Sequence, residues 1–335
     1  MVEQHTKARN LPPEWDGLCG DNYALKRTFL AQMERGNPSF QQYFVFRTPA
    51  GTIDSILVTF VSRRCNIFMF TPFTFRMNVT YAHVPLSVTR PGYVIGQATK
   101  TEVEQVLRNH KGCVIVLNAP PDLKLDGFAS GRTCSRINLH LRWSSLEQYI
   151  GSMRSHYRYR YRQALQRGAD LQYRFLADNR DFDERLYSFY ERVHAKSRTK
   201  IEKLSIDYFR APISKILVCE KDGQPLGFIQ LIENGRELVF AFTGLDYAHN
   251  RTYDTYINLL LKMVEYGIDK GFQVLELGQT AEDAKLKLGG KFTELHALLF
   301  HSNPVLHWFI HQIIGLISYK QPDADHRVFV KEDGS

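Results

Sequence analysis

The first half of the chain is dominated by residue types that favour strands. Phe, Val, Ile, Thr and Tyr recur between short breaks, a pattern typical of antiparallel strands. We expect one helix at residues 21–36, another at Thr101–His110 and a loop at 122–133. The expected strands are Gln42–Thr48, Thr52–Ser62, Asn66–Phe75, Met77–Val88, Cys113–Asn118 and Arg136–Arg142.

The second half has a more regular pattern. Apolar residues three and four apart predict helices at Ser144–Arg167, Asp181–Ser197, Ile206–Phe209, Tyr253–Lys270, Ala281–Leu288 and Pro304–Ile317. The expected strands are Leu171–Leu176, Lys215–Glu220, Pro225–Glu233, Glu237–Leu245, Gln273–Leu277 and Thr293–Phe300. Asp222-Gly223 and Asn234-Gly235 favour tight hairpin turns, so we expect the three central strands to pair in sequence. This order predicts an α/β fold.

Length and charge add two expectations. A chain of 335 residues with 44% hydrophobic residues is long enough to form two domains, each with its own core. The first half repeats the element order of the second in blurred form, and we place a boundary between Trp143 and Ser144, giving domains at 1–143 and 144–335. The 43 Lys and Arg residues against 35 acids leave a net charge of +8, which favours an anionic ligand.

The sequence favours a cytoplasmic protein. Residues Met1–Pro13 carry charges and two prolines where a signal peptide has an apolar run. The longest charge-free stretch, Leu295–Tyr319, contains four histidines and Pro304, which is a poor pattern for a spanning helix. We therefore expect no transmembrane segment, although peripheral contact with a membrane is compatible with the composition.

No residue pattern indicates a metal site. The five cysteines are spread without C-x-x-C spacing, which favours a reduced compartment. His307 and His311 have the spacing of two zinc ligands on a helix, but the segment HWFIH lacks the adjacent Glu and an obvious third ligand. We expect these histidines to pack with Trp308 and Ile313 instead, and no metal is predicted.

Three segments carry a resemblance to a known family. They are YRYRYRQALQRG (Tyr157–Gly168), YINLLLKMVEYGIDKG (Tyr256–Gly271) and LELGQTAEDAKLKLGG (Leu275–Gly290). Together with the order of elements, they resemble the FemAB-like branch of the GNAT acyltransferases. The resemblance implies a GNAT-like mixed sheet with flanking helices, in two GNAT-like units in tandem, the first degenerate and the second complete. The matching positions are Tyr157, Arg158, Arg162, Ala164, Gly168, Glu276, Gly278, Thr280, Lys285 and Gly289.

The resemblance implies N-acyl transfer, in which an amine attacks an activated ester or thioester and forms an amide. Acyl-CoA would be the co-substrate, no cofactor would be tightly bound, and the acceptor would be the amine of a small molecule or peptide. The glycine-containing acetyl-CoA loop of GNAT enzymes is absent, because the chain reads Asp246-Tyr-Ala-His-Asn-Arg-Thr252, and Gln279 stands where the branch often has Arg. Two alternatives stay open: an aminoacyl transferase that uses charged tRNA, and a non-catalytic binding protein.

Glu276 is the candidate catalytic residue. It lies between Leu275 and Leu277 in an expected buried strand, where desolvation favours the neutral acid and suits a general base that takes the proton of an amine. The alternative is a structural acid paired with an Arg or with backbone N–H groups.

The arginine-rich helix is the candidate substrate-binding element. Arg154, Arg158 and Arg162 share one face of the expected helix, with tyrosines between them. Guanidinium groups suit phosphates, so we assign Tyr157, Arg158 and Arg162 to substrate or RNA binding. A solvated basic face, or one paired with acids elsewhere, is the alternative.

The candidate donor-binding residues flank the expected fifth strand of the GNAT unit. Asn250, Arg251 and Thr252 lie at the expected N-terminus of the long helix, where free N–H groups receive phosphates in this fold. Lys285 matches the family position and is preferred over Lys287 as an anion contact. An ordinary capped helix and a solvated lysine are the alternatives.

Overall fold

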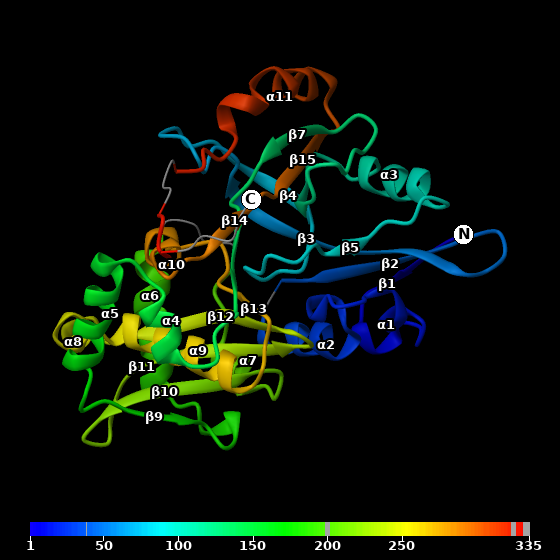
Figure 1. The fold of residues 1–335 in the computed structure, drawn as a ribbon. Coiled ribbons are helices and arrows are strands. Elements are labelled where there is room, and N and C mark those ends of the chain that lie inside the picture. Colours follow the sequence, from blue (N-terminus) through cyan, green and yellow to red (C-terminus); the bar gives the residue numbers. More distant parts are fainter. Residues whose placement is uncertain (38, 198–201, 323–325, 331–335) are drawn as a thin grey trace. The chain divides into compact units, whose positions relative to one another are not determined.

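The computed structural model describes residues 1–37, 39–197, 202–322 and 326–330, which form two compact units (Figure 1). The first comprises the described residues of Met1–Ser135, Ile201–Tyr208 and Glu294–Gln321. The second comprises those of Arg136–Lys200, Phe209–Thr293 and Pro322–Ser335. Each unit is built on a mixed sheet with flanking helices, as the GNAT-like fold class predicts.

The sheet of the first unit has the order β1-β2-β3-β4-β6-β15-β7, and β5 pairs with β3. All its neighbours are antiparallel except β4 and β6, which are parallel. Its strands are β1 (Val2–His5), β2 (Gln41–Arg47), β3 (Ile53–Asn66), β4 (Arg76–Ala82), β5 (Tyr93–Val94), β6 (Cys113–Ala119), β7 (Ala129–Arg132) and β15 (His296–His301).

Helices cover both faces of this sheet, because alternate residues of each strand point to opposite sides. On one face Val114 and Val116 of β6 pack with Val103 of helix α3. On the other face Ile115 packs with Ile310 of helix α11. The helices are η1 (Ala8–Asn10), α1 (Trp15–Leu18), η2 (Tyr23–Leu25), α2 (Arg27–Gly36), α3 (Lys100–Arg108) and α11 (Pro304–Ile317), while the short α7 (Ile206–Arg210) begins in this unit.

The sheet of the second unit has the order β14-β8-β13-β12-β11-β10-β9, and its parallel pair is β12 and β13. The expected hairpins are confirmed, because β10 pairs with β11 and β11 with β12. Asp222 and Gly223 both have positive φ angles, as their type of tight turn requires. The strands are β8 (Arg136–His140), β9 (Gln172–Phe175), β10 (Lys215–Lys221), β11 (Gln224–Asn234), β12 (Glu237–Leu245), β13 (Val274–Glu276) and β14 (Lys291–Thr293).

A polar contact ties two helices of the second unit together. Asn258 of α9 is buried, and its side-chain amide donates to the carbonyl oxygen of Ala164 near the end of α5 at 2.8 Å. A Cβ at Gly168 would lie 2.4 Å from the Asn258 amide nitrogen, so only glycine fits there. The helices of this unit are α4 (Leu146–Gly151), α5 (Ser155–Arg167), η3 (Asn179–Asp181), α6 (Glu184–Lys196), α8 (Tyr247–Tyr253), α9 (Thr255–Asp269) and α10 (Glu282–Lys287).

Several expected elements differ from the structure. The expected loop at 122–133 contains β7, and the expected strand Thr293–Phe300 is divided between β14 and β15. The helix expected at 21–36 is the short η2 followed by α2. Residues 67–75 form a loop rather than a strand, because the Asn66 side chain accepts from the backbone N–H groups of Phe68 and Phe75. The expected helix at 144–167 is two helices, α4 and α5, separated where Met153 makes a β-bridge with Phe329. The long helix begins at Thr255, not at Tyr253.

Residues 294–321 group with the first unit although they follow most of the second in sequence. The cause is β15, which pairs with β6 on one side and β7 on the other. The boundary between residues 143 and 144 stays a prediction about domains, while the compact units of the structure are discontinuous along the chain. Within the described ranges, no helix combines the length and apolarity needed to cross a bilayer.

Candidate functional site

The central feature of the second unit is the divergence of its two parallel strands. β13 pairs with β12 only from Val274 to Glu276, whereas β12 continues to Leu245. A register shift against β11 leaves Ala241 of β12 without a partner residue, a β-bulge that locally bends the strand. Beyond Val239, none of the described strands pairs with β12 on the β13 side. This open edge can bind an extended ligand through backbone hydrogen bonds.

Glu276 lies at the end of β13, at the start of this divergence. Its side chain is buried, and one carboxylate oxygen is 3.7 Å from a guanidinium nitrogen of Arg136 at the start of β8. The ion pair places a positive charge beside this buried acid. The sequence could not identify this partner, because 139 positions in the numbering separate Arg136 from Glu276 and only the sheet order brings them together.

Lys285 of α10 is the second buried charge of the site. Its side chain is 2% exposed, and its ammonium nitrogen lies 5.2 Å from the centre of the Phe240 ring. A Cβ at Gly278 would lie 3.5 Å from the same nitrogen. Burial lowers the pKa of Lys285 to about 7, and the charges of Glu282 and Glu276 only partly oppose this.

The two lysines of α10 differ in their surroundings. Lys287 has an acid four residues before it, and its ammonium nitrogen pairs with Asp283 at 2.6 Å. Lys285 also has an acid nearby on the helix, Glu282 three residues before it, so the local sequence does not distinguish the buried lysine from the partly exposed one. Only the match to the family position singled out Lys285.

The arginine-rich helix α5 makes contacts within its own unit. One guanidinium nitrogen of Arg158 donates to the carbonyl oxygens of Gly151 at 3.2 Å and Met153 at 3.3 Å, which supports the junction of α4 and α5. The hydroxyl of Tyr157 is hydrogen-bonded to a ring nitrogen of His326 at 3.2 Å. Arg162 is exposed. The substrate-binding roles of Tyr157, Arg158 and Arg162 stay predictions.

The expected donor-binding residues lie in α8 rather than at the N-terminus of the long helix. Asp254 adopts a left-handed conformation with φ 48°, which separates α8 from α9. The side-chain oxygen of Asn250 accepts from the backbone N–H of Tyr256 at 2.9 Å and so occupies one free donor of α9. Arg251 is exposed in the same short helix, and the ligand roles of Asn250, Arg251 and Thr252 stay predictions.

One acid connects α5 with α10. Asp283 pairs with Lys287, and His326 lies 3.5 Å from its other oxygen. Lys287 is the main cause of the lowered pKa of Asp283, with weaker contributions from His326 and Arg160 of α5. Two of the segments singled out in the sequence are therefore neighbours in space. Among the described residues no cluster of His, Cys, Asp and Glu could hold a metal ion.

Comparison with known proteins agrees with this architecture. Residues 151–286 match the family model described as Acetyltransferase (GNAT) domain. The structure is similar to that of FemX, with a TM-score of 0.56 and 10% identity over 92% of this chain and 100% of that chain. No curated protein sequence matches the chain significantly.

Two further solved structures share the fold. One is the C-terminal domain (DUF2156) of a protein named as a lysylphosphatidylglycerol synthetase from Agrobacterium fabrum, with a TM-score of 0.55 and 14% identity over 85% of this chain and 91% of that chain. The other is L-PGS from Bacillus licheniformis, with a TM-score of 0.50 and 11% identity over 85% and 95% of the two chains. At these low sequence identities, the structural similarity shows a shared fold and nothing more.

Proposed function

We propose that this chain is an N-acyltransferase, because residues 151–286 match the model of a GNAT acetyltransferase domain and the fold is similar to that of FemX. It would transfer an acyl group from acyl-CoA to an amine of a small molecule or peptide. The observation that carries the proposal is the open edge of β12, which begins beside the buried side chains of Glu276 and Lys285.

The reaction requires one nucleophilic attack and one proton acceptor. The amine nitrogen attacks the carbonyl carbon of the thioester, the carbon–sulfur bond breaks, and the proton lost by the amine passes to Glu276 or to a water that it orients. Backbone N–H groups of β12 near the bulge at Ala241 would stabilise the oxyanion of the tetrahedral intermediate. The thiolate of CoA leaves and is protonated from solvent.

Lys285 and the α8 residues would bind the anionic donor. An anionic group close to the Lys285 ammonium restores the charged form, because a nearby opposite charge favours it. Asn250, Arg251 and Thr252 would contact the donor's phosphates without a glycine loop. Tyr157, Arg158 and Arg162 would contact the acceptor.

Charged tRNA is the second candidate donor. The missing glycine loop at Asp246–Thr252 and the net charge of +8 suit a bulkier polyanion. The exposed arginines, Arg154 directly before α5 and Arg162 within it, suit it as well. In that case an aminoacyl ester takes the place of the thioester, and Glu276, or a water that it orients, would again accept the proton of the amine.

Replacement of Glu276 by Gln tests the assignment. The variant keeps the shape of the side chain and removes the base, so we expect a loss in kcat of roughly a hundredfold or more with little change in donor affinity. Turnover is measured as release of free thiol from acyl-CoA with a panel of amines, with Glu147→Gln, at an exposed acid of α4, as the matched control. Near-normal turnover of a folded Glu276→Gln protein would reduce Glu276 to a structural acid.

Calorimetry with acetyl-CoA, beside filter binding of charged tRNA, separates the donors. Stoichiometric CoA binding supports the first candidate and removes the second. Binding of tRNA alone supports the second. Binding of neither contradicts both and favours a non-catalytic binding protein.

A further inference from the structure

Helix α11 of the first unit has apolar side chains on its exposed side as well as on its buried side. Its sequence, PVLHWFIHQIIGLI, contains no acid, Lys or Arg. Ile310 and Ile317 are buried against the sheet, yet Val305, Trp308 and Leu316 are 72%, 63% and 73% exposed. A helix with apolar side chains on both sides is normally buried. Its 14 residues span about 21 Å, which is too short to cross a bilayer and is a common length for an interfacial helix.

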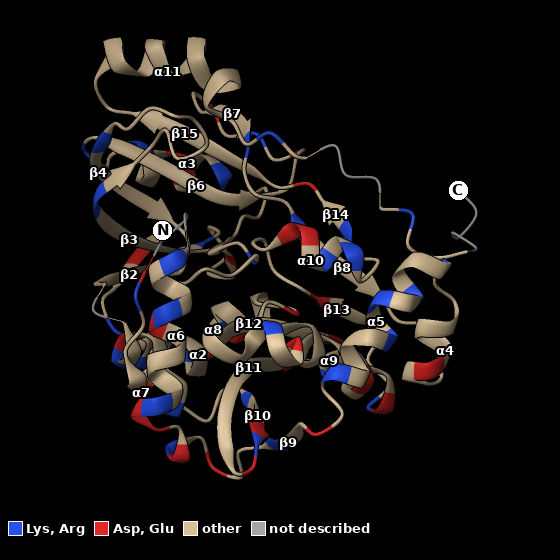
Figure 2. Ribbon diagram, turned by 90° about the vertical axis from the view of Figure 1, so that its left-hand side faces the viewer, with Lys and Arg blue, Asp and Glu red and all other residues tan. Residues whose placement is uncertain are grey.

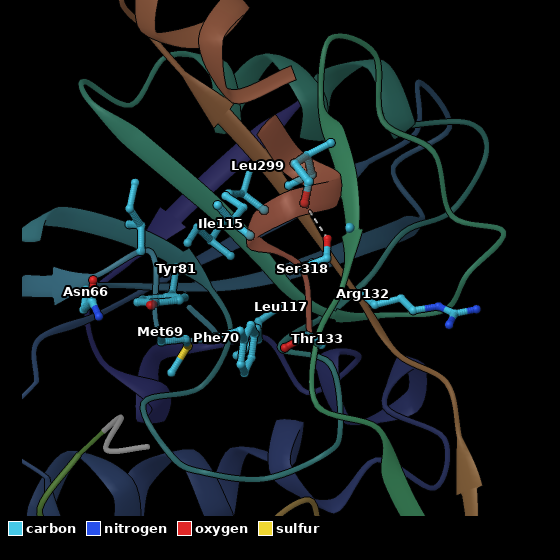
Figure 3. A pocket seen from close by; sticks show the side chains of 15 residues that line it. Asn66, Met69, Phe70, Tyr81, Ile115, Leu117, Arg132, Thr133, Leu299 and Ser318 are labelled. Carbon is cyan, nitrogen blue, oxygen red and sulfur yellow. Dashed lines mark hydrogen bonds between the residues drawn. The ribbon is translucent and has the colours of Figure 1, made fainter. Parts of the chain in front are cut away.

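The loop between β3 and β4 continues this apolar surface. Met69, Phe73 and Phe75 are 38%, 73% and 49% exposed. The loop and the end of α11 are in contact, because the Phe70 and Tyr319 rings lie 5.3 Å apart. Figure 3 shows the small cavity, of about 60 Å³, that Met69 and Phe70 line together with residues of α11 and the sheet.

Cations predominate around the surface, although the neighbouring loop that His311 contacts at Gly127 carries the exposed Asp126, which pairs with Arg108. No acid occurs from Ser55 to Thr101 or from Leu295 to Pro322, although the chain has 35 acids in 335 residues. Arg63, Arg64 and Arg76 flank the loop and are exposed, and Lys320 follows α11. In Figure 2, α11 carries no red or blue, and blue marks the neighbouring end of β4. The surface is therefore an apolar centre with a cationic rim.

We propose that α11 and the β3–β4 loop form a docking surface for an anionic lipid bilayer. Trp308, Phe309 and the loop aromatics would enter the boundary between headgroups and acyl chains, which is the preferred place of such side chains. The rim arginines would contact anionic headgroups. A second copy of the chain fits less well, because a symmetric pairing brings the same cationic rim of two copies together.

Vesicle binding tests the proposal on the full chain. The purified protein is sedimented with vesicles of phosphatidylcholine alone and with an equal mixture of phosphatidylcholine and phosphatidylglycerol. We expect binding to the mixed vesicles that weakens with salt. The double variant W308S/F309S should lower the partition coefficient about tenfold or more, because two exposed aromatic side chains no longer enter the lipid. V2S is the control, since Val2 is 42% exposed in the same unit on β1 and pairs with Phe46, away from the end of β3 that leads to the loop.

A second set of variants tests the rim. R63Q/R64Q/R76Q should weaken binding to the mixed vesicles and flatten its salt dependence. Because these side chains are exposed, folding should be retained, which circular dichroism checks. Quenching by brominated lipids that W308S/F309S abolishes reports insertion, since Trp308 is exposed while Trp15 is fully buried and Trp143 is half-buried.

Three results would overturn the proposal. The first is no sedimentation with either vesicle. The second is sedimentation that W308S/F309S leaves unchanged. The third is a concentration-dependent dimer in sedimentation velocity that W308S/F309S abolishes, which would assign the surface to a second copy.

Discussion

Replacing Lys285 by Met should stabilise the protein. The pKa of this lysine falls from its ordinary 10.5 to about 7 in the folded chain, because burial penalises the ammonium. The folded state therefore binds fewer protons than the unfolded state between these pH values, so the wild-type free energy of unfolding rises with pH in this window. Below pH 7 the full cost of the buried charge is present, and above pH 10.5 it is absent.

The size of the effect follows from the two pKa values. The difference between 10.5 and about 7 corresponds to about 5 kcal/mol at 1.36 kcal/mol per pKa unit. Met has a similar length and no charge, so Lys285→Met should be more stable than the wild type by about 4 kcal/mol at pH 7. The gain should shrink to about 2 kcal/mol at pH 9, since part of the wild-type penalty is then relieved.

Urea denaturation followed by circular dichroism at pH 7, 8 and 9 measures these differences. Lys287→Met is the control, because Lys287 forms a partly exposed pair with Asp283 and its loss should change stability by less than about 1 kcal/mol. Equal stability of the wild type and Lys285→Met at pH 7, or a difference that does not change with pH, would refute the reasoning. Loss of donor use in the more stable variant would indicate that the lysine is kept for binding.

Three further predictions concern the second unit. Gly168→Ala should lower the free energy of unfolding by about 1–3 kcal/mol, because the added Cβ meets the Asn258 amide at 2.4 Å; thermal unfolding measures it, and an unchanged Tm would contradict the close contact. Arg162→Gln should weaken ligand binding and reduce the salt dependence of that binding, with no loss of stability. Arg158→Gln should also lower the free energy of unfolding, because it removes the hydrogen bonds at the junction of α4 and α5. Equal effects of both variants on salt dependence and on stability would contradict this division. Binding of an anionic donor at pH 8 should be accompanied by proton uptake, because the bound anion raises the pKa of Lys285. Calorimetry in buffers of different ionisation enthalpy measures this uptake. Uptake that persists in Lys285→Met would show that another group takes up the proton.

Local patterns predicted most elements of the second unit. The turns at Asp222-Gly223 and Asn234-Gly235 specified the hairpins, because few residues accept positive φ at such positions. The apolar face of α9 specified that helix, but its start was missed because Asp254 takes a left-handed conformation that its neighbours do not signal. A capping side chain two turns away, such as Asn250, is likewise invisible to a local pattern.

Long-range pairings could not be predicted. The Arg136–Glu276 ion pair depends on the neighbourhood of β8 and β13, which no periodicity encodes. The strand around Leu298 was expected, yet its place between β6 and β7 was not, because an apolar alternation specifies a strand without naming its neighbours. The burial of Lys285 follows from packing in three dimensions in the same way.

The position of β15 has a consequence for how the chain is made. This strand, His296–His301, lies between β6 and β7, so the first sheet is incomplete until the ribosome has synthesised the residues after the entire second sheet. During that interval β6 exposes an unpaired edge, and β7 has no partner among the described strands, because it pairs only with β15. Such open edges are where nascent chains aggregate. A fragment of residues 1–143 would keep those open edges permanently, and a fragment of 144–335 would carry β15 as a strand without a sheet. Cutting this protein at its apparent midpoint therefore leaves neither piece whole.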